Sequence, residues 1–472
     1  MNDQIPLTQP ERATERAFRG TLLHTPARGQ LEMLHDALLI AGANGSIEAV
    51  HRAGTADHAA AVARFAERGQ LLALGPGQYL LPGMVDLHVH APQWPQLGKA
   101  LDLPLREWLQ KYTFPLEARY ADVKFAETVY ESLVDGLLAN GTTCALYYGT
   151  IHLPATRRLA EICLRRGQRA LIGRVAMDHP GQCPDYYRDS SAQVAIEETR
   201  QFIEQVRALP GNGAGAHGVP LIWPVITPRF IPSCTDELLH GLGALAQEAH
   251  CHIQTHCSES DWEHRYVFDR CGVSDTRALE RYGLLSRHTI LAHGNFVEDD
   301  DVAALVQHGA GVAHCPLSNV YFSDGVLPLR HLLERGVRAG LGTDISGGAS
   351  PSVIENARHA ILASRNLESG VDPAIARSQR RREGSRIEAP TALWLATAGG
   401  GIALDLPIGI FKTGYQFDAI VLDGTVSNSN LRVDPGEPAD VIAQKIIHHA
   451  ARANVREVWV GNRRVRQLDP TG

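Results

Sequence analysis

The chain of 472 residues is long enough for one large barrel with attached elements, or for two or three domains. Its composition, 44% hydrophobic and 21% charged, is typical of a globular enzyme, and the net charge of −7 offers no general attraction to nucleic acid or anionic membranes. No apolar run reaches the roughly 20 residues that span a bilayer, and the polar N-terminus lacks the apolar core of a secretory signal.

The eight cysteines include no Cys-x-x-Cys pair and are too few for a disulfide framework in a chain of this length. Together with the polar N-terminus, this favours a reducing compartment, and we expect a cytoplasmic protein with no membrane or nucleic-acid partner. The Arg-rich segment 376–386 is expected to be a solvated surface segment, since the rest of the chain is acidic overall.

Both ends of the chain have the pattern of short strands joined by turns. In residues 36–50, an apolar run, a Gly-Ala-Asn-Gly turn and a second apolar run predict a hairpin. A similar pattern returns in residues 417–424 and 456–467, where Gly461-Asn462 makes the turn. We expect the two ends to meet in one small β domain, because these strands have few local partners otherwise.

Between the two ends, predicted strands alternate with helical sequence. The helical periodicity is clearest from Ala126 to Leu137, where apolar residues recur three and four positions apart before Gly141 supplies a stop. The predicted strands are residues 84–90, 142–149, 170–177, 220–227, 251–256, 289–294, 311–316 and 337–344.

Eight strands each followed by helical sequence predict an α/β fold, a (β/α)₈ TIM-type barrel with a small β-sandwich domain formed from both chain ends. A doubly wound open sheet is the alternative, but no G-x-G-x-x-G follows an early strand. We expect residues 81–395 to form the metal-dependent barrel, and residues 1–80 and 396–472 to form the two parts of the β domain.

Histidines and an aspartate stand at the ends of four predicted barrel strands. His88 and His90 point the same way because they are two residues apart on a strand. His256, His293 and Asp344 end the fifth, sixth and eighth strands. Since these ends converge on one rim, imidazoles and a carboxylate would meet there as ligands for Zn²⁺ or Fe²⁺, with an open position for water.

Each of these residues also has a structural alternative. A lone histidine at a strand end is more often a hydrogen-bonded core or rim residue, and Asp344 could cap a helix or close a turn. The coincidence of four strand ends favours the metal site over these alternatives.

Glu259 follows His256 by three residues, where the predicted strand gives way to a loop. It would stand near a metal-bound water without being a ligand. Zinc lowers the pKa of its water to about 7, so a nearby carboxylate can remove the proton and carry it to a substrate nitrogen. The alternative for Glu259 is a solvated loop acid.

Two sets of motifs resemble a known family. The first resembles the amidohydrolase superfamily over nearly the whole chain and consists of PGMVDLHVH, HCSE, LAHG, HCPLSN and LGTDISGG. The second is similar to the guanine deaminases and consists of HAPQ, DLPLREWLQKYTFPLE (102–117), NGTTCALYYGTIH (140–152) and ITPRF (226–230).

The resemblance implies hydrolysis of guanine to xanthine and ammonia in purine catabolism or salvage, by a homodimer. It implies one zinc ion per chain, rather than Fe²⁺, held by His88, His90, His256 and Asp344. Zinc-bound hydroxide would attack C2 of guanine, with Glu259 as the proton shuttle.

The resemblance also implies roles for residues around the water and the purine. His293 would orient or polarise the water, and Asp344 would hold or accept its proton. Gln93, Arg229 and Phe230 would hold the purine, which His256, Glu259 and Asp344 would also face.

The residue types agree with these roles. Arginine presents a planar fork of donors, the Gln93 amide can donate and accept on one edge, and Phe230 or Trp94 could stack on a flat ring. Arg229 could instead form a salt bridge to a neighbouring loop, and both aromatic residues could be core. Residues 320–325 could line the pocket with larger rings than is usual in the family.

Several other functions compete with this one. A related amidohydrolase would deaminate another aminated heterocycle, such as a modified guanine, a pterin or a triazine. A cytidine-deaminase-like fold is disfavoured because its Cys-based signature is absent. A two-metal relative would need a bridging lysine, which the third and fourth predicted strands lack, and a silent scaffold protein would be expected to lose ligands.

Overall fold

A computed structural model describes residues 14–212, 219–323 and 325–467 of the protein. Residues 1–13, from which we expect no secretory signal, lie outside these ranges, as does position 324 within the predicted pocket segment 320–325. None of the described helices is long and apolar enough to cross a membrane. All eight cysteines fall in the described ranges and are free thiols.

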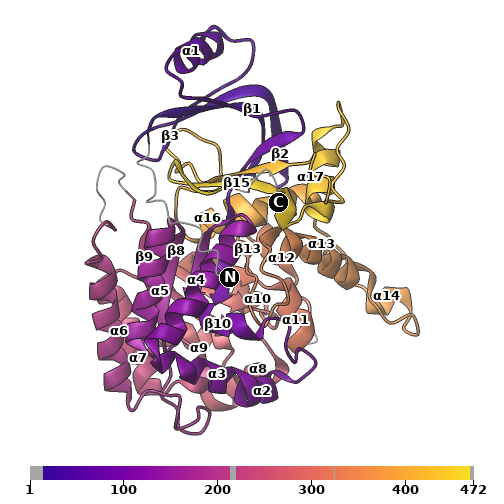
Figure 1. Ribbon diagram of the computed structural model, residues 1–472. Helices are drawn as coiled ribbons and strands as arrows, with labels where there is room; N and C mark the ends of the chain where they lie inside the picture. Colours follow the sequence, from indigo (N-terminus) through magenta and orange to yellow (C-terminus); the bar gives the residue numbers. More distant parts are fainter. Residues whose placement is uncertain (1–13, 213–218, 324, 468–472) are drawn as a thin grey trace.

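Eight parallel strands form the barrel in sequence order, and each of the eight predicted ranges overlaps one of them (Figure 1). The predicted (β/α)₈ fold is therefore confirmed. The barrel strands are β6 (Met84–His90), β7 (Thr142–Tyr148), β8 (Arg169–Ala176), β9 (Ile222–Pro228), β10 (His252–Cys257), β11 (Thr289–His293), β12 (Gly311–His314) and β13 (Arg338–Leu341).

The first and last strands meet through the segment that follows β13. Val89 and Ile345 form a parallel bridge, and the backbone N–H of His90 donates to the carbonyl of Ile345 at 2.8 Å. These contacts close the barrel at its C-terminal end, the end at which barrel enzymes carry their active sites.

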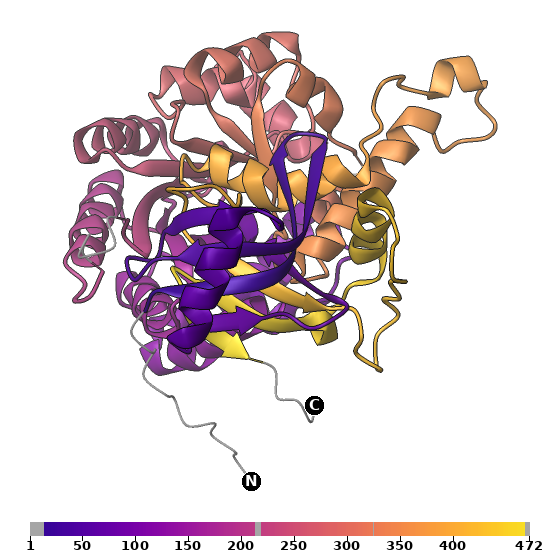
Figure 2. The same cartoon turned by 90° about the horizontal axis from the view of Figure 1, so that it is seen from above.

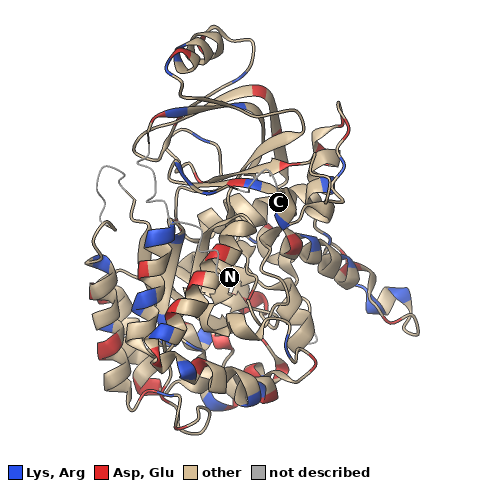
Figure 3. Cartoon of the chain, viewed as in Figure 1, with Lys and Arg blue, Asp and Glu red and all other residues tan. Residues whose placement is uncertain are grey.

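The outer helices follow the barrel strands. They are α4 (Val123–Ala139), α5 (Leu153–Arg166), α6 (Ala192–Arg207), α7 (Asp236–Ala249), α8 (Asp261–Cys271), α9 (Asp275–Arg281), α10 (Asp299–His308), α11 (Pro316–Phe322), α12 (Leu329–Glu334) and α13 (Val353–Ser369), with the short turn η4 (Ile231–Ser233) before α7. Acidic and basic residues are interspersed along the outer helices that face the viewer in Figure 3.

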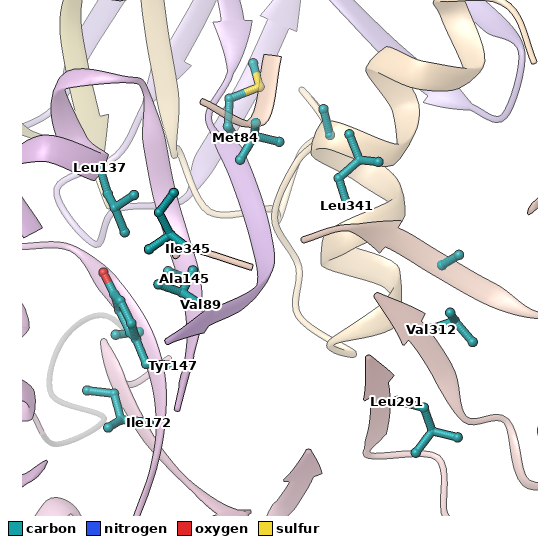
Figure 4. Close-up of a cluster of buried hydrophobic side chains, with 14 of the residues drawn as sticks. Met84, Val89, Leu137, Ala145, Tyr147, Ile172, Leu291, Val312, Leu341 and Ile345 are labelled. Carbon is teal, nitrogen blue, oxygen red and sulfur yellow. The ribbon is translucent and has the colours of Figure 1, made fainter. Parts of the chain in front are cut away.

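The boundaries of α4 follow from its sequence. Asp122 caps the N-terminus by accepting hydrogen bonds from the N–H groups of Lys124 and Phe125, and Gly141, with φ of +84°, follows the C-terminus in a conformation that favours glycine. Its apolar side joins the large buried cluster between strands and helices. Figure 4 shows part of this cluster, including Leu137 of α4 and Tyr147 of β7.

An irregular insertion lies between β6 and α4. Its short helices are η1 (Ala91–Gln96), α2 (Leu105–Trp108), the π-helical turn η2 (Leu109–Thr113), α3 (Phe114–Ala118) and η3 (Arg119–Ala121). This insertion begins directly after His90, so it is attached at the C-terminal rim of the barrel.

The two chain ends meet in one mixed sheet with the order β16-β15-β14-β5-β1-β2-β3, in which β4 pairs with β1 (Figure 2). The predicted hairpins β2–β3 and β15–β16 are both present, and the antiparallel pair β5–β14 joins the two ends. The strands are β1 (Arg16–Ala27), β2 (Gln30–Ala41), β3 (Ile47–His51), β4 (Leu71–Ala73), β5 (Gln78–Pro82), β14 (Ala419–Asp423), β15 (Val455–Val460) and β16 (Arg463–Gln467).

The remaining helices lie in or beside the chain ends. They are α1 (Ala56–Glu67), α14 (Arg377–Arg380), α15 (Ala389–Trp394), the π-helical turn η5 (Leu395–Gly399), α16 (Gly400–Ala403), α17 (Ala439–His449) and η6 (Arg452–Asn454). The predicted domain boundaries at residues 80 and 395 stay a prediction. The Arg-rich segment around α14 projects from the body (Figure 1), with Arg377, Arg381 and Arg386 exposed as expected.

A buried ion pair links the barrel to the β domain. The guanidinium of Arg169, on β8, donates from Nε to Asp418 Oδ2 at 2.8 Å and from NH2 to Oδ1 at 3.1 Å. Both side chains are at most 2% exposed. Asp418 also accepts from the backbone N–H of Gly461 at 2.8 Å, so one carboxylate joins the barrel to the β15–β16 turn.

We expect Asp418→Ala to lower the free energy of unfolding by about 3–5 kcal/mol, because it leaves a buried guanidinium without its counter-ion. Urea unfolding followed by circular dichroism measures this change. Glu248→Ala is the control. Because the ion pair of Glu248 with Arg200 is exposed, this substitution should leave the unfolding transition nearly unchanged. An Asp418→Ala transition at the wild-type urea concentration would contradict the expectation.

Candidate active site

Four histidine rings converge at the C-terminal end of the barrel. His88 and His90 leave β6 on one side, while His256 and His293 come from the ends of β10 and β11. The ring centroid of His88 lies 4.9 Å from those of His90 and His256 and 5.3 Å from that of His293. All four rings are buried, so the convergence predicted from the strand ends occurs.

Asp344 reaches the same point from a loop. The sequence places it at the end of the eighth strand, but β13 ends at Leu341, three residues earlier, and the chain turns through a φ of +49° at Asp344. Its Oδ1 lies 3.2 Å from Nε2 of His88 and 3.5 Å from Nε2 of His90. The predicted position on the strand is therefore wrong, while the predicted proximity to the histidines is correct.

The backbone and Asp86 hold Asp344 in place. The N–H of Asp344 donates to the carbonyl of His88 at 2.8 Å. The buried carboxylate of Asp86 accepts from the backbone N–H of Thr343 at 2.9 Å and from its hydroxyl at 2.6 Å. Burial raises the pKa of Asp86 to about 7, although these hydrogen bonds from Thr343 oppose the shift.

The converging atoms form a metal-binding group. Ligand atoms lie within 4.8 Å of one another in two overlapping sets, one of His88, His90 and His256 and the other of His88, His293 and Asp344. Burial lowers the pKa of His88, His90 and His256 well below the usual value, which keeps the rings neutral with free lone pairs. Neutral imidazoles and a carboxylate are the donors that Zn²⁺ accepts.

A hydrogen bond from the outer side of the His256 ring orients its ligand nitrogen toward the other histidines. Nδ1 of His256 lies 2.6 Å from the carbonyl of Arg229, which fixes the proton on Nδ1 and leaves the lone pair on Nε2. That Nε2 lies 2.9 Å from Nε2 of His90. Two ring nitrogens this close are well suited to share a cation, so the residues present fit a metal ion.

Glu259 is buried beside this group, so the alternative of a solvated loop acid is wrong. Its Oε2 lies 3.7 Å from Nε2 of His293, and its backbone N–H donates to Oε2 of Glu263 at 2.8 Å. Burial, followed by the negative charge of Asp344, raises the pKa of Glu259 well above its usual value. A carboxyl with a raised pKa can both take and return a proton near neutral pH.

Asn319 determines the tautomer of His293. The sequence had not indicated this residue individually. Its Oδ1 lies 2.9 Å from Nδ1 of His293 and has to accept the proton that this nitrogen carries, which leaves Nε2 unprotonated toward Glu259. Burial lowers the pKa of His293, so the ring is neutral. Asn319 belongs to the motif HCPLSN, which marks its neighbourhood but does not indicate this contact.

A cavity opens over the metal-binding group. Its walls come from the barrel rim, the β6–α4 insertion and the segment after β12. The lining residues are His90, Gln93, Leu105, Trp108, Leu109, Arg229, Phe230, His256, Glu259, Phe322, Asp344 and Gly347.

The predicted substrate-binding residues Gln93, Arg229 and Phe230 all line this cavity. Phe322, within the predicted segment 320–325, lines it too, and its ring centroid lies 5.0 Å from that of Trp108. Trp94 does not line the cavity. Its indole N–H donates to Ser132 of α4, and its partly buried ring packs against the outside of the core.

Glu117 and the inward-facing side of α2 and η2 were not predicted from the sequence. Glu117 accepts from the guanidinium of Arg229 at 2.6 and 3.1 Å and from the amide of Gln93 at 2.9 Å. Arg229 thus lines the cavity and also forms a salt bridge. Glu117 and Trp108 lie in the stretch 102–117 noted for its resemblance, but no residue pattern indicated which side chains face inward.

Comparison with known proteins gives consistent results. The model of the amidohydrolase family matches residues 79–465. A probable guanine deaminase of Schizosaccharomyces pombe is 36% identical over 95% of this chain and 83% of its own length. The guanine deaminase of Dictyostelium discoideum is 35% identical over 96% and 98%.

A solved structure of guanine deaminase from C. acetobutylicum, with guanine bound in its active site, is similar over the whole fold. Its TM-score is 0.83, its identity is 27%, and the alignment covers 96% of this chain and 100% of that one. The similarity therefore includes both the barrel and the sheet formed by the chain ends.

We expect the purified protein to hold about one equivalent of divalent metal, and His256→Ala to weaken metal binding by at least about tenfold because it removes a central donor. Metal analysis after dialysis against a weak chelator measures both. His449→Ala, an exposed histidine on α17, is the matched control and should retain the metal. Equal metal content in the His256→Ala and wild-type proteins would contradict this assignment.

Proposed function

Because this chain belongs to the amidohydrolase family and, within it, to the guanine deaminases, we propose that it hydrolyses guanine to xanthine and ammonia. The enzyme is a hydrolase acting on C–N bonds. The observation that carries the proposal is the cavity in which a metal-binding group, a buried carboxyl and the polar pair Gln93 and Arg229 face one small space.

We propose one zinc ion per chain, held by His88, His90, His256 and Asp344. Three neutral imidazoles and a carboxylate suit zinc better than Fe²⁺, for which an open two-histidine and one-carboxylate set is characteristic. Zinc at such ligands lowers the pKa of the water that it binds to about 7.

Glu259 supplies the proton transfers. It takes a proton from the attacking water and delivers one to the ring nitrogen beside C2, so that the C2–O bond forms as the ring nitrogen gains a proton. The C2–N bond then breaks, the amino group leaves as ammonia with the remaining proton, and xanthine results. The burial of Glu259, which raises its pKa, supports this double role.

His293 and Asp344 fix the direction of attack. Nε2 of His293, unprotonated because Nδ1 is engaged by Asn319, accepts a hydrogen bond from the water. Asp344 adds a second acceptor on the His88 side of the same space. A water has two O–H groups, so when one proton goes to Glu259 the other O–H can point to His293 or to Asp344, which leaves a lone pair toward the ring.

Gln93, Arg229 and Phe230 hold the purine. Arg229 offers N–H donors to the ring oxygen O6, and Gln93 binds beside it. The rings of Phe230, Trp108 and Phe322 give the cavity flat aromatic walls that suit a planar ring. A homodimer in the cytoplasm stays a prediction, to be checked by sedimentation velocity and by cell fractionation.

We expect the zinc-loaded enzyme to convert guanine to xanthine with one equivalent of ammonia, and Glu259→Gln to lower kcat about 10²–10⁴-fold while zinc is retained, because the amide cannot carry the proton. Loss of the ultraviolet band of guanine, with metal analysis of the same sample, measures both. Asp261→Asn, an exposed acid two residues away, is the control and should keep full activity.

A panel of aminated rings makes this test specific. Rapid turnover of a pterin, a triazine or a modified guanine without turnover of guanine would show that the substrate is another ring, while the proposed type of reaction would still hold. An active Glu259→Gln enzyme would remove Glu259 from the mechanism.

A further inference from the structure

Glu117 connects Gln93 and Arg229, two of the polar side chains that line the cavity, without itself lining it. Its Oε1 accepts from both Nε2 of Gln93, at 2.9 Å, and NH2 of Arg229, at 3.1 Å, while its Oε2 accepts from NH1 of Arg229 at 2.6 Å. The Glu117 side chain is 0% exposed and that of Arg229 is 3% exposed. A fully buried carboxylate with these three donors cannot move independently of either partner.

Arg229 is fixed in both position and plane by α3. The two-point pairing with Glu117 sets the plane of the guanidinium, and its central carbon lies 5.1 Å from the ring centroid of Phe114. Glu117 uses two of the five N–H donors. The remaining donors of Arg229 are the ones available to a ligand in the cavity.

Glu117 also fixes the orientation of the Gln93 side-chain amide. A carboxylate only accepts, so the NH₂ end of the amide has to face Glu117. The opposite end, Oε1, then accepts from the backbone N–H of Ser346 at 3.4 Å and retains an acceptor lone pair. A flipped amide would set its carbonyl oxygen against the carboxylate and lose both contacts.

We infer that Glu117 is a positioning residue that fixes a donor, Arg229, beside an acceptor, Oε1 of Gln93, and thereby selects rings with a carbonyl next to an N–H. This inference rests on the proposed function. Guanine presents this edge as O6 and N1–H. A ring with an amino group at C6 and an unprotonated N1 presents the opposite order, which leaves buried groups of the site unpaired.

Comparing two purines measures the contribution of this ring edge separately. Guanine and 2,6-diaminopurine both carry the amino group at C2 that would leave, and they differ at C6 and N1. In the zinc-loaded wild-type enzyme, we expect kcat/KM for guanine to exceed that for 2,6-diaminopurine by at least about 100-fold.

In Glu117→Gln, we expect kcat/KM for guanine to fall about 10- to 100-fold, mainly through KM, while the value for 2,6-diaminopurine changes less than about threefold. The selectivity ratio therefore collapses. Glu117→Asp keeps the charge that pairs with the buried guanidinium but withdraws it by one methylene, so we expect the same change to a smaller extent. Glu107→Gln, an exposed acid in α2, is the control.

Zinc content and the thermal unfolding midpoint are measured on the same samples. A purely structural role would lower activity on both rings in parallel with the midpoint or the zinc content, and would overturn the inference. So would an unchanged selectivity ratio in Glu117→Asp, which tests the idea even if Glu117→Gln does not fold. A wild-type enzyme inactive on guanine would overturn the proposed function itself, a result visible before any variant is made.

Discussion

The closure of the barrel and the assembly of the site depend on the same backbone hydrogen bonds. The N–H of Asp344 donates to the carbonyl of His88, and the N–H of His90 donates to the carbonyl of Ile345. These two bonds join the first strand to the segment after the last one. Because they involve the metal-binding residues themselves, the distance between the Asp344 carboxylate and the histidine rings is set by the closure of the fold.

All the charged groups of the site are buried, and their pKa values depend on the counter-charge that each of them has. Burial opposes the charge of Arg229, but the carboxylate of Glu117 outweighs this effect and raises its pKa above the usual value. Glu259 and Asp344 have raised pKa values, to about 6 for Asp344, chiefly through burial. A cation at the histidines would offset this cost, since the charge of Arg229 lowers the pKa of both carboxyls but does not outweigh burial.

The sequence predicted the parts of the site that follow from local rules. The alternation of side chains on a strand puts His88 and His90 on one face, and the position of His256 and His293 at strand ends puts them on the same rim. The position of Asp344 after β13 was missed because a short strand and a turn with positive φ leave no periodic pattern.

The roles of Glu117, Trp108 and Asn319 could not be predicted because each depends on a partner far away in the chain. Glu117 is buried only because Arg229, 112 residues later, supplies its counter-charge. A glutamate in a stretch with short, irregular helices is usually a surface residue, so its sequence context indicates exposure. The pairing of Trp108 with Phe322 likewise requires the insertion to fold over the rim.

The site therefore divides into a rigid part and an attached part. The metal-binding histidines lie on barrel strands, whose positions the whole sheet fixes, whereas Gln93, Trp108 and Glu117 belong to the insertion between β6 and α4. Arg229, directly after β9, is where the two parts meet, because its carbonyl orients His256 while its guanidinium pairs with Glu117. A change in the insertion can thus alter which ring edge is accepted, while the hydrogen bonds that aim the metal-binding nitrogens stay intact.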